Sequence, residues 1–253
     1  MLRLATYSYV IVNREYHRWF SPNLQRDMEM LVFGHAGAEA LVFPTRAGRF
    51  FDYENWGMVR ALAEPIERGQ LQLFCVDSVD GESLYGHGIA PHARIGRHKQ
   101  YEQYLLTEVV PLMLSKAENP FLIAHGCSIG AYHAVTLALR HPNLFGKVVA
   151  LSGRYDLTRW YGSFPDLFDG YYDDDIYFHT PNHFLPQLSD SRLLRAIQSM
   201  EIVLAVGDQD PFKASTEELS RQLSNKGVEH AFAVWEGEAH KARYWRRMVR
   251  CYL

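Results

Sequence analysis

The 253-residue sequence predicts an α/β fold, in which helices cover both faces of a mostly parallel, twisted sheet. Short apolar runs alternate with longer amphipathic segments from residue 38 to the C-terminus, a pattern typical of parallel strands joined by helices. The hydrophobic fraction of 47% and the charged fraction of 22% are ordinary for a globular protein. Because no repeat, low-complexity tract or linker interrupts the pattern, we expect residues 1–253 to form a single domain.

The expected strands are short runs that are apolar throughout or alternate between apolar and polar residues. They cover residues 2–12, 27–35, 39–44, 71–79, 121–124, 147–152, 201–207 and 230–237. The expected helices are the longer stretches 55–70, 99–116, 131–140, 214–227 and 241–253. Pro65 and Pro111 are expected to kink or interrupt the first two helices, because proline has no backbone N–H to donate.

One stretch, residues 154–188, breaks the alternation and is crowded with aromatic residues and prolines. It is either an irregular excursion that packs on itself or a lid or pocket wall, and we favour the second because long insertions in compact domains are often functional. Its aromatic side chains are expected to provide an apolar binding surface. They are Trp160, Phe164, Phe168, Tyr171, Tyr172 and Phe178. The acidic run at residues 173–175 is expected to be solvated, because no ligand-spaced His or Glu follows it.

The segment Gly126-Cys127-Ser128-Ile129-Gly130 lies between an apolar run and an Ala-rich helical stretch. A chain that turns sharply from a strand into a helix leaves no room for Cβ atoms beside the turn, and glycine meets this requirement. The pattern therefore predicts a nucleophile elbow with the Ser128 hydroxyl exposed at its apex. An ordinary loop serine is the alternative, and the strand before and helix after the motif favour the elbow.

A serine hydroxyl needs a base to become a nucleophile at neutral pH. Among twelve histidines, His240 is the expected base because it follows the last strand and precedes the last helix. The acid that orients it is expected in the segment Asp208-Gln-Asp210, after the preceding strand, and we choose Asp210 because Asp208 directly follows a turn glycine. Asp156 is the third choice, and His125 is expected to line the pocket.

Composition excludes several other classes of protein. The net charge of −3 argues against a nucleic acid or an anionic membrane as the partner. Three cysteines do not form a disulfide framework, and the N-terminus shows neither a signal peptide nor a membrane span, so we expect a cytoplasmic protein. His87, His92 and His98 share one expected loop but lack a complete ligand pattern, so we expect no metal and no cofactor.

Three segments together resemble a family of α/β-hydrolases named Putative esterase, which includes esterase D-like S-formylglutathione hydrolases, feruloyl esterases and the mycolyltransferase antigen 85 group. They are "GCSIGAYHAVTLALRHPNLFGKVVALSG", "VGDQDPF" and "EGEAHKARYW", and the resemblance extends from about residue 28 to the C-terminus. It implies an α/β-hydrolase fold, with Ser128 as nucleophile, Asp210 as acid and His240 as base. It also implies a carboxylesterase acting on small-molecule esters through an acyl-serine intermediate, and we expect short acyl or aryl groups. The sequence leaves the oligomeric state open.

The sequence departs from the family where such hydrolases carry His-Gly after the third strand, since Pro44-Thr45 stands there. The expected oxyanion-hole donors are the backbone N–H groups of Ile129 and Arg46, and loss of one donor costs about 3 kcal/mol of transition-state stabilisation. Arg46 and Arg49 are alternatively anion-binding residues. Two other functions stay open. An acyltransferase would share the same triad and pass the acyl group to an acceptor other than water. The missing His-Gly leaves open a hydrolase-fold binding protein with a weakened triad.

Overall fold

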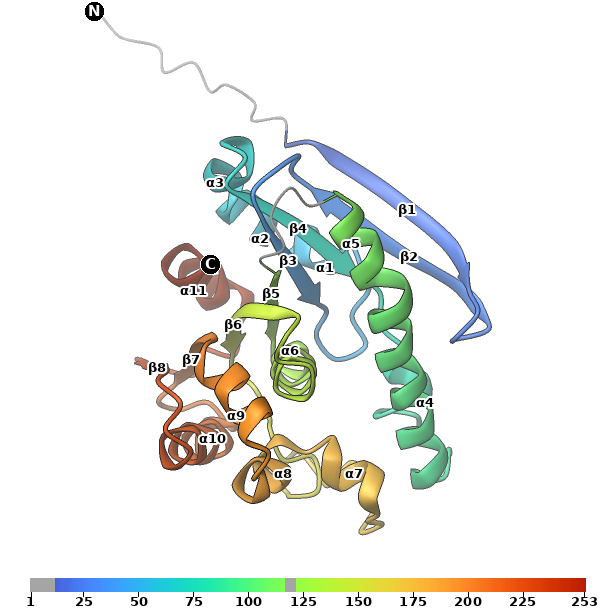
Figure 1. Ribbon diagram of the computed structural model, residues 1–253, viewed down its shortest axis with the longest axis vertical. Helices are drawn as coiled ribbons and strands as arrows, with labels where there is room; N and C mark the ends of the chain where they lie inside the picture. Colours follow the sequence, from blue (N-terminus) through green and yellow to red (C-terminus); the bar gives the residue numbers. More distant parts are fainter. Residues whose placement is uncertain (1–11, 117–121) are drawn as a thin grey trace, which may run out of the picture.

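The computed structural model describes residues 12–116 and 122–253. An eight-stranded sheet forms its centre, in the order β1-β2-β4-β3-β5-β6-β7-β8 (Figure 1). β1 pairs antiparallel with β2, and β2 pairs antiparallel with β4, whereas all the other neighbours are parallel. The strands are β1 (Arg14–Ser21), β2 (Arg26–Phe33), β3 (Ala38–Phe43), β4 (Leu71–Val76), β5 (Leu122–Cys127), β6 (Phe145–Leu151), β7 (Glu201–Gly207) and β8 (Ala231–Trp235).

Helices cover both faces of this sheet, as the sequence predicts. One face carries α1 (Asp52–Asn55), α2 (Met58–Ala61), α3 (Ala63–Glu67) and α11 (Ala242–Tyr252). The other carries α4 (Pro91–Tyr104), the π-helical turn η2 (Leu105–Val109), α5 (Val110–Lys116), α6 (Ile129–Arg140), α8 (Pro181–Gln187), α9 (Ser191–Gln198) and α10 (Lys213–Asn225). No helix within the described residues is long and apolar enough to cross a membrane.

The central strands are buried on both faces, which explains why they are apolar throughout. In β5, Leu122 and Ala124 pack under α6, whereas Ile123 and Cys127 pack under the helices of the opposite face. This alternation follows from the two-residue period of a strand. Burial of both faces places the two layers of the core against one sheet, as in other parallel α/β proteins.

The N-terminal part of the sheet differs from the expectation. The predicted strand 2–12 lies outside the described residues apart from Val12, whereas β1 at Arg14–Ser21 was not predicted. The exposed face of β1 carries polar and aromatic side chains, so its sequence lacks a clear apolar run. The predicted helix 55–70 is wrong in detail, because α1, α2 and α3 are three short helices, and Gly57 between the first two has φ +70°.

The predicted helix 99–116 begins eight residues earlier, at Pro91, and His92 and His98 lie in it and not in a loop. Proline is suited to the first turn of a helix, where its missing N–H needs no partner. Pro111 does not interrupt the helix, since α4, η2 and α5 run in line (Figure 1). The wider π turn comes directly before Pro111, whose ring would press on the Thr107 carbonyl in a regular α-helix.

The insertion contains more regular structure than the sequence indicates. An isolated β-bridge joins Tyr161 to Phe164, and residues 174–187 form the short helices α7 (Asp174–Phe178) and α8. The insertion lies toward the carboxyl ends of the parallel strands (Figure 1). Asp173 accepts a hydrogen bond of 2.9 Å from the Ile176 N–H and caps α7, and Lys99 forms an ion pair with Asp175. Two of the three acidic side chains therefore have structural partners.

His125 lies inside β5 with no exposed surface, so the expectation that it lines a pocket is wrong. Its Nδ1 lies 2.7 Å from the Val149 carbonyl oxygen, and the Tyr53 ring meets it edge-on at 5.6 Å. Burial lowers the pKa of His125 to about 4 from its ordinary value of 6.5. The folded protein therefore keeps this imidazole neutral at pH values where the unfolded chain protonates it.

This depressed pKa predicts a loss of stability in acid. The contribution of His125 is fully present above pH 6.5 and declines as the pH falls from 6.5 to 4, by at most about 3 kcal/mol. We expect His125→Asn, which does not titrate in this range, to flatten the decline. Urea unfolding of both proteins between pH 4.5 and 7 measures the difference, and equal slopes would contradict the prediction.

Candidate active site

Ser128 occupies the sharp turn between β5 and α6, with φ 58° and ψ −123°. A non-glycine residue with this backbone conformation is strained, and such strain is typical of functional sites. The Ser128 N–H donates a hydrogen bond of 2.8 Å to the Leu151 carbonyl at the end of β6, which anchors the turn to the sheet. Ser128 is partly exposed, whereas the residues on either side of it are buried.

The two glycines of the motif are required by close backbone contacts. A Cβ atom at Gly126 would lie 2.2 Å from the Gly130 carbonyl group. A Cβ atom at Gly130 would lie 2.6 Å from the Phe43 carbonyl oxygen and 2.7 Å from that of Pro44. The first turn of α6 therefore packs directly on the end of β3, and this contact places Ser128 beside the loop that follows β3.

Gly126→Ala is expected to destabilise the protein by about 3 kcal/mol, because the new methyl group meets backbone atoms that cannot move aside without shifting α6. Gly96→Ala is the matched control, since Gly96 lies in α4 with nothing within 4 Å of its added Cβ. It should be neutral or slightly stabilising. Thermal and urea unfolding compare the two, and equal stability of both variants would show that the close approach is unimportant.

The structure brings Ser128, His240 and Asp210 together. His240 Nε2 lies 3.0 Å from Ser128 Oγ, and His240 Nδ1 lies 3.1 Å from Asp210 Oδ2. Asp210 is buried and accepts a further hydrogen bond of 2.9 Å from the Phe212 N–H through its other oxygen. Asp208 is exposed and accepts a hydrogen bond of 2.7 Å from the Gly237 N–H, so it serves the turn.

Asp156, the third candidate acid, does not reach His240. Its carboxylate accepts hydrogen bonds from Thr158 and lies 3.2 Å from His183 Nε2. These contacts lower the pKa of Asp156 although burial alone would raise it. It therefore stays ionised inside the insertion and stabilises that segment.

Two aromatic rings hold the imidazole of His240 in place. Phe212 contacts it at 5.5 Å between ring centroids and Trp245 at 5.3 Å, both edge-on. Trp245 is itself fixed, because its Nε1–H donates a hydrogen bond of 3.2 Å to Ser152 Oγ. The sequence analysis missed both rings, although each lies within five residues of a predicted member of the triad.

The loop after β3 combines an exposed arginine with a paired one. The guanidinium of Arg46 lies 4.8 Å from the centre of the Tyr85 ring. Arg49 forms ion pairs with Asp77 at 2.8 Å and Glu29 at 2.6 Å. Its charge is therefore neutralised, which removes the reason to consider Arg49 an anion-binding residue. Ile129 is the first residue of α6, where backbone N–H groups have no partner within the helix.

The aromatic residues of the insertion do not form one surface over Ser128. Phe164 contacts Phe212 at 4.8 Å and so reaches the vicinity of His240. Phe168 is buried in an apolar cluster with Ile129, whereas Trp160 is 70% exposed. Tyr171 and Tyr172 are also exposed, and their hydroxyls bond to Asp173 and to His183.

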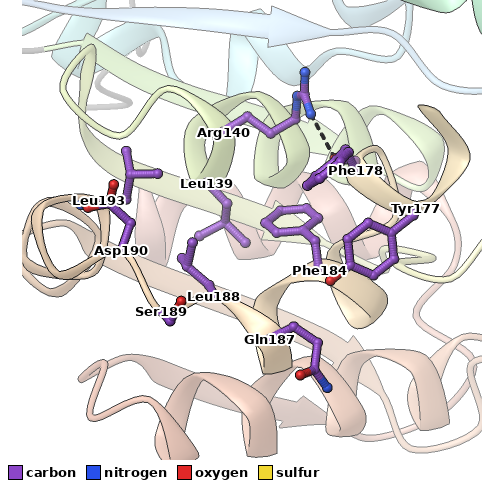
Figure 2. Close-up of a pocket in the computed structure, with 10 residues that line it drawn as sticks. All are labelled: Leu139, Arg140, Tyr177, Phe178, Phe184, Gln187, Leu188, Ser189, Asp190 and Leu193. Atoms are coloured by element: carbon purple, nitrogen blue, oxygen red, sulfur yellow. Dashed lines mark hydrogen bonds between the residues drawn. The ribbon is translucent and has the colours of Figure 1, made fainter. Parts of the chain in front are cut away.

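Phe178 lies at the wrong end of α6 to contact a substrate on Ser128. It lines a cavity of about 370 Å³ with Leu139 and Arg140, the last residues of α6 (Figure 2). The Arg140 Nη1–H donates a hydrogen bond of 2.9 Å to the Phe178 carbonyl. Eleven residues of helix separate this cavity from Ile129, which corresponds to about 16 Å. The position of α7, which the sequence did not predict, explains the difference.

The fold and this serine-centred arrangement define an α/β-hydrolase. The family model described as "Putative esterase" matches residues 76–249, which is more than half of the chain. The chain therefore belongs to this family and is a carboxylic ester hydrolase, and the predicted resemblance is confirmed. A comparison with curated proteins gives no match.

Solved structures agree in fold. A ferulic acid esterase is similar with 16% identity and a TM-score of 0.75, over 95% of this chain and 96% of that chain. The fluorophosphonate-binding serine hydrolase F of Staphylococcus aureus is similar with 16% identity and a TM-score of 0.69, over 95% of this chain and 96% of that chain. An S-formylglutathione hydrolase of the same organism is similar with 15% identity and a TM-score of 0.66, over 95% of this chain and 97% of that chain. At such identities the likeness supports the α/β-hydrolase fold and not a particular substrate.

Proposed function

We propose that this protein hydrolyses carboxylic esters of short acyl or aryl acids through an acyl-serine intermediate. The observation that carries the proposal is the continuous hydrogen-bonded chain from Ser128 Oγ through the imidazole of His240 to the buried carboxylate of Asp210. This order of nucleophile, base and orienting acid is the one that serine hydrolases use. The chemistry needs neither a metal nor a cofactor.

In the first half of the reaction, Ser128 Oγ attacks the carbonyl carbon while His240 takes the hydroxyl proton. The tetrahedral intermediate collapses, the bond to the alcohol oxygen breaks, and His240 returns the proton to the leaving alcohol. In the second half a water molecule attacks the acyl-serine and gives a proton to His240. The free acid then leaves as Ser128 recovers its proton.

The negative charge on the carbonyl oxygen needs donors that are in place before the reaction. We assign this role to the backbone N–H of Ile129, at the start of α6, and to that of Arg46 in the loop after β3. The contact between Gly130 and the carbonyl oxygens of Phe43 and Pro44 supports the assignment, since it holds the two segments side by side. The positive end of the α6 dipole adds to the stabilisation.

Phe164 and Phe212 supply the apolar surface next to the imidazole. Aromatic rings in this position favour an acetyl, butyryl or aryl group over a long acyl chain, because extra methylenes that do not fit cost more than their burial gains. Trp160, Tyr171 and Tyr172 are too exposed in this structure to be given the same role.

A fluorophosphonate probe and a series of 4-nitrophenyl esters from acetate to decanoate test the proposal. We expect one phosphonyl group on the peptide that contains Ser128, and a maximum of kcat/KM at butyrate or shorter. A folded protein that neither hydrolyses an ester nor reacts with the probe would overturn the proposal. A maximum at decanoate would overturn the assignment of a short acyl group.

A further inference from the structure

Arg154 is a buried cation that has no carboxylate partner among the residues the structure describes. It follows β6 by three residues and is 2% exposed. Its Nε–H donates to the Asp156 carbonyl at 3.2 Å, and its Nη2 donates to three more backbone carbonyls of the insertion, at 2.6–3.3 Å. These acceptors are Leu157, Arg159 and Pro165. All four are neutral, and within residues 12–116 and 122–253 no carboxylate lies within ion-pair distance of the guanidinium.

The other well-buried arginine of this region has a carboxylate partner. Arg94 is 7% exposed and pairs with Asp169. Two acids, Asp156 and Asp166, act on Arg154 from a greater distance. The Asp156 carboxylate already has Thr158 and His183 as hydrogen-bond partners. The Asp166 carboxylate already accepts hydrogen bonds from the N–H groups of Phe168 and Gly170. Burial accordingly lowers the pKa of Arg154. A buried charge without a counter-charge is costly, so such a site gains from an anionic ligand.

One donor of Arg154 is unused. Nη1 donates no hydrogen bond to any residue that the structure describes, whereas Nε and Nη2 are fully engaged. The guanidinium carbon lies 5.9 Å from the centre of the Phe212 ring, and the same ring contacts His240 at 5.5 Å. A single aromatic side chain thus touches both the unpaired cation and the base of the triad.

A second cation, Arg46, contacts a residue that lines a cavity. Arg46 stacks on Tyr85, a residue on which the charge of Arg154 also acts. Tyr85 lines a cavity of about 480 Å³ whose other lining residues include the apolar Leu84 and Leu167. Its charged lining residues are Arg94, Asp166 and Asp169. Leu84 and Leu167 pack in one apolar cluster with Ile129, which directly follows Ser128. The cavity therefore adjoins the apolar cluster that contains Ile129, and Arg46 stacks on one of its lining residues, Tyr85.

We infer that the ester substrate carries a carboxylate a few bonds from the scissile carbonyl, and that Arg154 binds this carboxylate through Nη1 with Arg46 as the second cation. This inference rests on the proposed function. Arg154 binds substrate in this assignment and takes no part in proton transfer. The carboxylate lies either in the acyl group or in the alcohol, and both place an anion beside the same cations.

Matched pairs of esters distinguish the two sources. Mono-4-nitrophenyl glutarate carries the carboxylate on the acyl side, and its methyl ester is the neutral control. 3-Carboxyphenyl butyrate carries it on the alcohol side, and its methyl ester is again the control. In at least one pair, we expect the wild-type kcat/KM for the anionic ester to exceed that for the neutral ester by about tenfold or more. A factor of this size corresponds to the free energy of one charge-assisted hydrogen bond. A preference for the neutral ester in both pairs would overturn the inference.

Arg154→Gln should remove this preference, with at least a tenfold fall in the ratio of anionic to neutral kcat/KM. Arg159→Gln is the matched control, because Arg159 belongs to the same insertion, is 59% exposed and pairs with Glu218. It should leave the ratio unchanged. If Arg154 had only a structural role, its substitution would lower the activity on both esters equally. An unchanged ratio of anionic to neutral kcat/KM in a folded Arg154→Gln would overturn the proposal.

Calorimetry with monomethyl glutarate on the wild-type protein gives a readout that needs neither turnover nor a folded variant. Binding that weakens as salt rises would support the anion site, and no binding at millimolar ligand would overturn it. This measurement also separates the two proposals. A protein that binds the anion but is inert toward esters and the fluorophosphonate would refute the proposed function and leave the anion site standing.

Discussion

Replacement of Ser128 by alanine is expected to lower kcat/KM for 4-nitrophenyl butyrate by on the order of 10⁴-fold or more, with the fold retained. Alanine removes Oγ, which lies 3.0 Å from His240 Nε2, and leaves the imidazole without a proton to accept. The residual rate should come from the backbone donors and the bound geometry alone. Steady-state hydrolysis and fluorophosphonate labelling of the same preparation measure both effects.

Ser224→Ala is the control for this substitution, since Ser224 is exposed on α10 and belongs to no part of the site. It should retain full activity and full labelling. Circular dichroism should show the same unfolding temperature for Ser128→Ala as for the wild-type protein within a few degrees, because alanine occupies the same strained turn. Undiminished turnover by a folded Ser128→Ala would show that another residue is the nucleophile.

The elements that the sequence predicts well are those whose burial pattern is simple. β3, β4, β6 and β7 are buried on nearly every residue, so their apolar runs are unmistakable. The elbow is predictable for a different reason, because two backbone contacts at Gly126 and Gly130 exclude every other residue type. Local steric contacts and burial restrict the residue types directly, so these four strands and the turn between β5 and α6 can be predicted from the sequence, and the structure contains them.

The parts that the sequence predicts poorly depend on contacts between distant segments. β1 is paired on one side only and reads as a polar strand, and His125 is polar yet buried because Val149 lies within hydrogen-bond distance of its ring. Phe178 belongs to α7, whose position is set by packing on α4 and α8. Neither periodicity nor composition records such partners, which is also why the unpaired guanidinium of Arg154 is visible only in the structure.

Asp210→Asn is expected to lower turnover by up to about 10⁴-fold while the fold is preserved. The amide can occupy the same buried position and still accept the hydrogen bond from the Phe212 N–H, so stability should change little. It cannot stabilise the imidazolium that forms when His240 takes the Ser128 proton, and an amide N–H facing Nδ1 favours the wrong tautomer of the imidazole. The loss should appear in kcat more than in KM.

Asp208→Asn is the matched control for this last prediction. Asp208 lies two residues away, ahead of the same helix, yet its side chain faces the Gly237 N–H at 2.7 Å and not the imidazole. An asparagine oxygen accepts that hydrogen bond as well as a carboxylate oxygen does, so we expect turnover within the same order of magnitude as the wild-type protein. A pH–rate profile for each variant completes the comparison. Equal losses at both positions, or a larger loss at Asp208, would overturn the choice of Asp210 as the acid that orients His240.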